Sequence, residues 1–280
     1  MEIKARMKLF QPALTERRVP VDPAGGDLDH EWIVTNGLGG YASGTIAGLN
    51  TRRFHGLLIA ALPAPFGRMM LLNQLDECFT NSYGRFHLTE KDPSVAARPG
   101  ETDSSLQSFA MENGLPVFRY AGEGFLLEKR ICMVHRQNST YIAYRLIEGD
   151  SGALEIRPGI HVRPHEGTLG EIKTEGYRFS AIYQGYELTV DPALPSLKLR
   201  CWGADSSFHL SFDQRSDLQY RIEQNRGYDW QGDLWSPGRF TVQLGQGPSA
   251  YLVASSEPWD SVEAFSPQGA SEAEIGRAHV

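Results

Sequence analysis

The sequence has few cysteines, no long apolar run and no excess of basic charge. Its three cysteines, Cys78, Cys132 and Cys201, lie far apart among 280 residues and form no C-x-x-C pair. A disulfide framework and a structural zinc site are therefore not expected. No stretch approaches the roughly 18 to 20 apolar residues that a membrane-spanning helix needs. The N-terminus is too interrupted by charge to resemble a secretory leader, so we expect no membrane association and a cytoplasmic location.

The charge balance argues against another class of partner. Lysine and arginine number 27 against 34 aspartates and glutamates, a net charge of −7, and the charges are spread without long runs. Because nucleic-acid-binding proteins usually gather basic residues on one surface, we expect no nucleic acid partner. The eight histidines are dispersed and show no metal-ligand spacing, so neither a metal nor another cofactor is expected.

Helical periodicity is also scarce, because no i, i+3, i+4, i+7 stripe extends beyond about two turns. Beyond residue 50, alternating or β-branched runs are broken about every 8 to 12 residues by turn-forming residues. These runs span residues 54–62, 125–134, 141–147, 154–162, 177–183, 197–202, 208–212, 240–244 and 251–254. They predict an all-β protein, a large antiparallel β-sandwich with little helix.

Residues 1–256 are expected to form this sandwich as one domain. Residues 89–106 are polar and carry proline and glycine, which predicts a long excursion or crossover loop. Residues 257–273 lose the strand pattern and predict a helical start or a linker to a further domain. Residues 274–280, EIGRAHV, match the translation of a common sequencing adapter, which leaves two origins open: an assembly artefact or a natural terminus.

The most distinctive stretch is residues 36–56, NGLGGYASGTIAGLNTRRFHG. Two of its glycines and an alanine fit G-x-G-x-x-A, the pattern of a dinucleotide-binding turn. The helix that this turn requires would contain two further glycines, and no acidic residue follows before Asp76 to bind a ribose. We therefore expect a constrained turn over Asn36–Gly40 in which at least one glycine has a positive φ.

Arginines and a histidine follow this glycine-rich turn. If residues 51–55 form a strand, Arg53 and His55 lie on one side and Arg52 lies on the other. One arginine is then expected to hold an internal carboxylate, with Glu31, Asp76 and Glu77 as the candidates. The other arginine remains available for a binding surface.

Three stretches of the sequence resemble a known family. EWIVTNGLGGYASGTIAGLNTRRFHGLL resembles the start of the N-terminal domain of bacterial and archaeal glycogen debranching enzymes of the amylo-α-1,6-glucosidase type. FLLEKRICMVHRQNSTYIAYRL and NRGYDWQGDLWSPGRF resemble its middle strand pair and its late loop, so the likeness runs from about Glu31 to Glu257. Two positions depart from the family pattern: Phe54 stands where tyrosine is expected, and Arg136 stands where glycine is common, in the turn at 135–137.

The resemblance implies a non-catalytic β-sandwich domain of a glycoside hydrolase that acts in glycogen catabolism. In the family, the glucosidase carboxylates lie in a following α/α-barrel, which this chain is expected not to reach. The implied partners are an α-glucan, glycogen or limit dextrin, and the enzyme's own catalytic barrel. The alternative is a stand-alone carbohydrate-binding or structural β-sandwich module without chemistry.

No catalytic residue is assigned from the sequence. Hydrolysis of a glycosidic bond needs two carboxyl groups roughly 5 to 9.5 Å apart, and no such pair stands out. Aromatic residues near turns would suit a sugar surface, although they equally suit core packing. The candidate substrate- or interface-binding residues are Asn36, Gly37, Tyr41, Arg52, Arg53, His55, Asp233 and Trp235.

Overall fold

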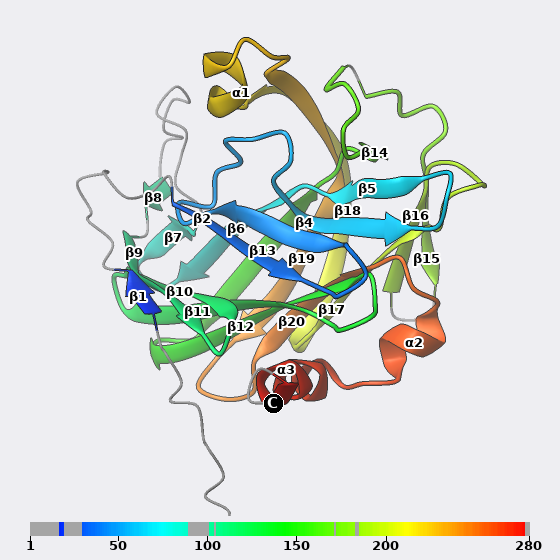
Figure 1. The fold of residues 1–280 in the computed structure, drawn as a ribbon. Helices are drawn as coiled ribbons and strands as arrows, with labels where there is room; N and C mark the ends of the chain where they lie inside the picture. Colours follow the sequence, from blue (N-terminus) through cyan, green and yellow to red (C-terminus); the bar gives the residue numbers. More distant parts are fainter. Residues whose placement is uncertain are drawn as a thin grey trace, which may run out of the picture.

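The computed structural model describes residues 17–19, 30–88, 101–103, 105–170, 172–182 and 185–277. Strands dominate these residues and form three sheets, and three short helices accompany them (Figure 1). One sheet has nine strands, and smaller sheets of six and five strands face it. Every strand pair is antiparallel except β7 and β8, so the predicted antiparallel β-sandwich is confirmed.

The nine-stranded sheet has the order β1 (Arg17–Val19), β9 (Ser105–Glu112), β10 (Leu115–Gly122), β11 (Phe125–Met133), β12 (Ser139–Gly149), β20 (Ala250–Ser255), β17 (Leu197–Trp202), β16 (Gly185–Thr189) and β15 (Arg178–Ile182). The six-stranded sheet has the order β18 (Ala204–Gln219), β19 (Gln231–Leu244), β13 (Gly152–Gly159), β6 (Gln74–Asn81), β7 (Gly84–His87) and β8 (Glu101–Asp103). The five-stranded sheet has the order β14 (Arg163–Pro164), β5 (Gly67–Leu72), β4 (Gly56–Leu62), β3 (Tyr41–Thr45) and β2 (Glu31–Thr35). The helices are α1 (Arg221–Asn225), α2 (Trp259–Glu263) and α3 (Pro267–Arg277).

The core lies between the nine-stranded sheet and the two smaller sheets, all of which contribute to one hydrophobic cluster. Strand alternation decides which side chains enter it. In β12, Ile142, Tyr144 and Leu146 share the inner face and are at most 5% exposed. Every predicted run overlaps a strand, and most ends differ by a few residues. The strands β18 and β19 extend well beyond the runs predicted at 208–212 and 240–244. None of the described helices is long and apolar enough to cross a membrane.

A buried ion pair joins the two layers through this core. Glu77 of β6 is fully buried, and one of its carboxylate oxygens lies 2.6 Å from Lys129 Nζ of β11. Its other carboxylate oxygen accepts a hydrogen bond from the hydroxyl of Tyr144, which is also fully buried. Because both oxygens of Glu77 have partners, its charge is matched inside the core. Glu77 is thus unavailable to the arginines for which it was a candidate.

The predicted loop at 89–106 is shorter than expected. Residues 101–103 form β8, and β9 begins at Ser105 and pairs with β10. Residues 89–100 and 104 lie outside the described residues, so the rest of this prediction stays untested.

The segment after β20 forms helices that pack on the outer face of the nine-stranded sheet, at the bottom of Figure 1. Val262 of α2 and Ala270 of α3 are buried there together with Tyr141. Glu274 of α3 accepts a hydrogen bond from the backbone N–H of His135 at 2.7 Å. The helical start expected in this segment is confirmed, and its role as a linker stays a prediction. Residues 278–280 lie outside the described part of the chain.

Candidate functional site

The turn Asn36–Gly40 joins β2 to β3 as an antiparallel hairpin. Gly37 and Gly39 have φ of +76° and +97°, so the predicted positive-φ glycine is confirmed. A strand rather than a helix follows the turn, which agrees with the rejection of a dinucleotide-binding motif.

Asn36 organises this turn from a fully buried position. Its side-chain oxygen accepts hydrogen bonds from the backbone N–H groups of Leu38 at 2.9 Å and Gly40 at 3.0 Å. Its amide nitrogen donates to the carbonyl of Gln137 at 2.9 Å and to the side-chain oxygen of Asn138 at 3.0 Å. The side chain of Asn36 therefore links the turn to the β11–β12 connection, and these bonds occupy the groups that a ligand would need.

Residues 51–55 form a turn and not a strand, so the period-2 assignment of their side chains is wrong. The backbone N–H of His55 donates to the carbonyl of Arg52 at 3.0 Å, which closes the turn. Arg52 pairs with Glu31, one of its three expected partners, and His55 Nε2 lies 3.4 Å from the same carboxylate oxygen. Because a turn replaces the extended chain, Arg52 and His55 lie on the same side instead of opposite sides.

His55 is a buried, neutral histidine, only 3% exposed. Burial lowers the pKa of its imidazole to about 4, although the nearby Glu31 carboxylate opposes the shift. Nδ1 lies 3.4 Å from the backbone N–H of Arg52 and accepts from it, which leaves the hydrogen on Nε2, facing Glu31. His55 therefore supports the turn.

Tyr41, Arg53, Phe54 and His165 meet beside this turn. The Arg53 guanidinium lies 4.8 Å from the centre of the Phe54 ring, and the Phe54 and His165 ring centres are 4.9 Å apart. Tyr41 contacts the His165 ring edge-on at 5.8 Å and donates its hydroxyl to the carbonyl of Phe54 at 2.9 Å. Burial raises the pKa of Tyr41 to about 12, so its hydroxyl is protonated near pH 7.

Arg163 of β14 fixes this arrangement, and sequence reasoning missed it. The side chain is buried and donates to the backbone carbonyl of Arg53 and to that of His165, the latter at 3.1 Å. Burial lowers the pKa of Arg163, and the neighbouring Arg53 charge adds to the shift. In the sequence, Arg163 stands in the short run HVRPH, and nothing in this run indicates which group the arginine would contact.

The site carries an excess of positive charge. Arg68 donates to the carbonyl of Gly39 at 2.7 Å, and the positive charges of Arg68, Arg163 and Arg53 add to burial in lowering the pKa of His165. Within the described part of the chain, none of these three arginines lies within 4.0 Å of a carboxylate. We call Arg53, Arg68 and Arg163, with Tyr41, Phe54 and His165, the arginine cluster. It offers hydrogen-bond donors to an oxygen-rich partner.

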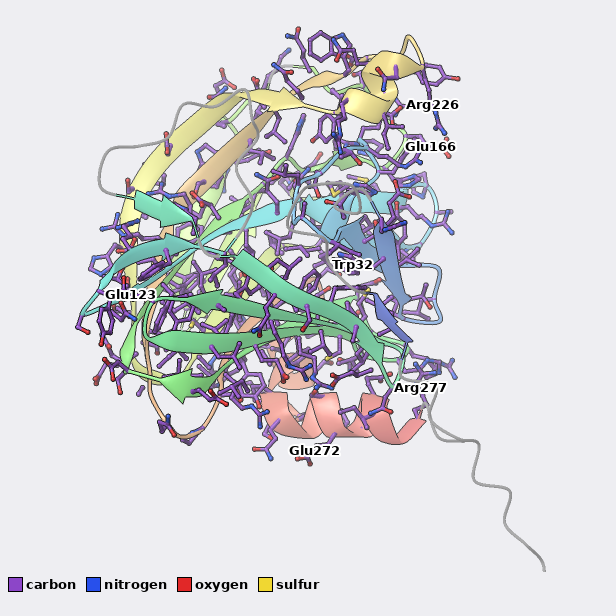
Figure 2. All side chains as sticks on the ribbon, turned by 90° about the vertical axis from the view of Figure 1, so that its left-hand side faces the viewer. Trp32, Glu123, Glu166, Arg226, Glu272 and Arg277 are labelled. Atoms are coloured by element: carbon purple, nitrogen blue, oxygen red, sulfur yellow. The ribbon has the colours of Figure 1, made fainter. Side chains whose placement is uncertain are left out.

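The arginine cluster lies at one end of the molecule. Figure 2 shows Glu166, the neighbour of His165, at the same end as Arg226, next to α1. Glu272 and Arg277 of α3 lie at the opposite end in the same view. A backbone hydrogen bond joins α1 to the turn at residues 51–55, because the N–H of Ile222 donates to the carbonyl of Thr51 at 3.1 Å.

The other two candidate residues lie on β19. Trp235 is 7% exposed and packs edge-on against Tyr177 at 5.2 Å, as part of the core. Asp233 accepts a weak hydrogen bond from Gln214 at 3.3 Å, and its charge acts on the nearby His161. Across the described residues, no hydrogen bond, ion pair or ring contact joins either of them to the arginine cluster. The structure therefore brings together Tyr41, Arg52, Arg53 and His55 of the eight candidates.

The clearest pairing of carboxylates occurs elsewhere, on β9 and β11. Glu112 and Glu128 share Arg119, at 2.8 and 3.0 Å, and Glu112 also lies 2.8 Å from Arg130. Arg145 lies 3.8 Å from Glu128 as well, so three guanidinium groups surround these two carboxylates, and neither acid is free to face a sugar. No group of three or more potential metal ligands occurs among the described residues.

Comparison with known proteins identifies a family for most of the chain. Residues 30–251 match the family described as Glycogen debranching enzyme N terminal. No significant match is found among curated proteins.

Two solved structures show more distant likeness. A bacterial glucoamylase complexed with acarbose covers 95% of this chain at 9% identity, with a TM-score of 0.42. A mutant of the heparan sulfate lyase HepC from Pedobacter heparinus covers 55% at 14% identity, with a TM-score of 0.35. The chain spans only 40% and 22% of the lengths of these two proteins.

Proposed function

Because the chain belongs to the family of glycogen debranching enzyme N-terminal domains, we propose that it is the non-catalytic N-terminal domain of an amylo-α-1,6-glucosidase. In this role the sandwich supports the hydrolysis of α-1,6 branch points in glycogen or related α-glucans by a C-terminal α/α-barrel in the cytoplasm. The family match carries the proposal, since it runs from the residue before β2 into β20 and thus spans nearly all of the described sandwich.

The chemistry of the described side chains fits a supporting role. Glycoside hydrolysis needs one carboxyl group that gives a proton and a second that acts on the opposite side of the bond. Glu112 and Glu128 are instead engaged by arginines. The arginine cluster contributes guanidinium groups, which can donate hydrogen bonds but cannot replace the two carboxyl groups. The hydroxyl hydrogen of Tyr41 is already donated to the carbonyl of Phe54.

We assign the contact with the catalytic barrel or its bound glucan to the arginine cluster. Arg53 is half-buried, and its backbone is held by Arg163. Its guanidinium has no carboxylate partner within the described residues, so it can bind carboxylates or sugar hydroxyl groups from another domain or a substrate. Asn36 and Gly37 then act indirectly, by shaping the neighbouring turn.

The test compares the 280-residue chain with a longer protein that includes the barrel encoded downstream. Glucose released from a limit dextrin is expected from the longer protein, and not from the short chain above a mock-purified control. Arg53→Ala in the longer protein is expected to lower kcat/KM by about tenfold, because a charged hydrogen bond is lost. The exposed Lys173→Ala is the matched control.

Two outcomes contradict the proposal. Glucose release by the short chain alone would place the chemistry within these residues. A genuine stop codon after residue 280 in genomic DNA, together with glycogen binding by the short chain, would favour the stand-alone carbohydrate-binding module.

A further inference from the structure

A polar cavity of about 130 Å³ lies over the six-stranded sheet, away from the arginine cluster. Its lining comes from four strands and includes Asp76, Arg85, Glu155, Arg157 and Arg239. These side chains are held by one another, since Glu155 lies 2.8 Å from Arg85 and 3.6 Å from Arg239. Alternation explains their grouping, because residues two apart on β6, β7 and β13 share one face of the sheet.

A second, smaller cavity adjoins the first and shares Asp76 and Arg157 with it. Asp213 and Trp235 line this second cavity, and Asp213 lies 3.4 Å from Arg157. The ring of Phe212 stacks on Trp235 with ring centres 5.9 Å apart, and Phe212 is 64% exposed. The two cavities share two lining residues, and the smaller one is mainly apolar, with an exposed aromatic ring beside it. We call the two cavities together the groove.

Across the two cavities, the arginines and the carboxylates are equal in number. Arg85, Arg157 and Arg239 contribute three positive charges, and Asp76, Glu155 and Asp213 contribute three negative charges. His87 also lines the larger cavity, 3.6 Å from Asp76. A balanced lining gives no net attraction for a phosphate or another anion. The groove nevertheless presents fixed hydrogen-bond donors and acceptors next to each other, which suits a neutral ligand rich in hydroxyl groups.

We propose that this groove is a second carbohydrate-binding site, which takes a segment of α-glucan chain outside the catalytic centre. The proposal rests on the proposed function for the identity of the ligand. Neighbouring sugar hydroxyl groups can donate to Asp76 and Glu155 while they accept from Arg157 and Arg239. The exposed Phe212 ring offers an apolar face against which a pyranose ring can pack. Such a site would hold the polymer while its branch points are hydrolysed elsewhere.

Isothermal titration of maltoheptaose into the 280-residue chain tests this proposal without any hydrolysis. Arg157→Gln, which alters both cavities, is expected to raise Kd by about tenfold through lost charged hydrogen bonds. Phe212→Ala is expected to raise Kd by about fivefold through lost ring packing. Tyr228→Ala is the control, since Tyr228 is 58% exposed and lies outside the groove.

Phe212→Ala keeps the test decisive if Arg157→Gln fails to fold, because its side chain is mostly exposed. Unchanged maltoheptaose binding in the folded groove variants would overturn the proposal. Binding of inorganic phosphate in place of maltoheptaose would also overturn it, because the charge argument would be wrong. If Arg53→Ala is the one variant that weakens maltoheptaose binding, the groove is not the binding site, and the proposed function is unaffected. If the longer protein releases no glucose, only the proposed function is contradicted.

Discussion

Gly40 is a residue of the glycine-rich turn that is packed tightly against both side-chain and backbone atoms. A Cβ atom there would lie 2.7 Å from Asn36 Nδ2 and 2.9 Å from the backbone oxygen of Ile59. Asn36 cannot move away without breaking the hydrogen bonds that define the turn. Close approach therefore requires glycine at this position, whereas Gly39 is required by its backbone angle.

We predict that Gly40→Ala and Gly39→Ala destabilise the protein to different extents. Gly40→Ala is expected to lower the free energy of unfolding by about 2 kcal/mol or more through overpacking. Gly39→Ala is expected to cost about 1 kcal/mol, because φ is +97° but the nearest atom to the added Cβ lies 3.7 Å away. Urea unfolding measures both variants, and an equal or larger loss in Gly39→Ala would contradict the assignment.

Arg136 adopts a backbone conformation that favours glycine. Its φ is +59°, and its backbone N–H donates to the carbonyl of Asn36 at 2.7 Å. The turn is therefore kept although arginine stands where the family resemblance leads one to expect glycine. The cost of this departure is backbone strain in Arg136 and not a lost contact.

Arg136→Gly is predicted to stabilise the folded protein by about 0.5 kcal/mol, because relief of strain exceeds the added entropy of the unfolded chain. Asn113→Gly is the matched control, since Asn113 has φ of +54° but asparagine tolerates this region better. The gain in the control should be smaller when both are measured by urea unfolding. Destabilisation by Arg136→Gly would show that its side chain matters more than its backbone.

At the scale of elements, the loop at 51–55 shows where local sequence reasoning fails. The run T-R-R-F-H reads as an extended segment, because its residue types give no turn signal. The turn is instead stabilised by Arg163, which lies 110 residues further along the chain and donates to the carbonyl of Arg53. A contact at this separation leaves no trace in the local pattern. The sequence predicted that one of the two arginines pairs with one of three carboxylates, and Arg52 with Glu31 fulfils this, although the pair is partly exposed and not internal.

We predict that Arg52→Ala is mild and Arg163→Met is severe. The side chains of Arg52 and Glu31 are 26% and 37% exposed, so loss of this pair should cost about 1 kcal/mol or less. Arg163 is 4% exposed and donates to the backbone carbonyls of Arg53 and His165, which lose this donor when Arg163 is removed. It also donates to the carbonyl of Pro164, which keeps the backbone N–H of Gly167. Its loss should cost about 3 kcal/mol or more. Equal losses in chemical unfolding would contradict this ranking of the two arginines.

At the scale of the whole molecule, side-chain alternation and turn spacing were enough to predict the sandwich. The order of the strands within each sheet could be learned only from the structure. Lys129 shares the inner face of β11 with the core residues Leu127 and Ile131. A charged residue at an inward position signals a buried partner. The sequence does not say that the partner is Glu77 on the opposite layer, because the register between layers depends on packing of distant strands.

Buried neutral histidines give the whole protein a dependence on pH. Burial lowers the pKa values of both His55 and His161 to about 4, from 6.5, and the Arg163 charge contributes for His161. Between these values the unfolded chain binds protons that the folded chain excludes, so stability falls as pH falls from 6.5 towards 4. When the pH falls from 7 to 5, each histidine should lower the free energy of unfolding by about 2 kcal/mol. Urea unfolding at both values is expected to show a shallower loss in His55→Gln and His161→Gln than in the wild type, while the exposed His209→Gln retains the wild-type loss. An unchanged loss in the double variant His55→Gln/His161→Gln would exclude these two histidines as its source.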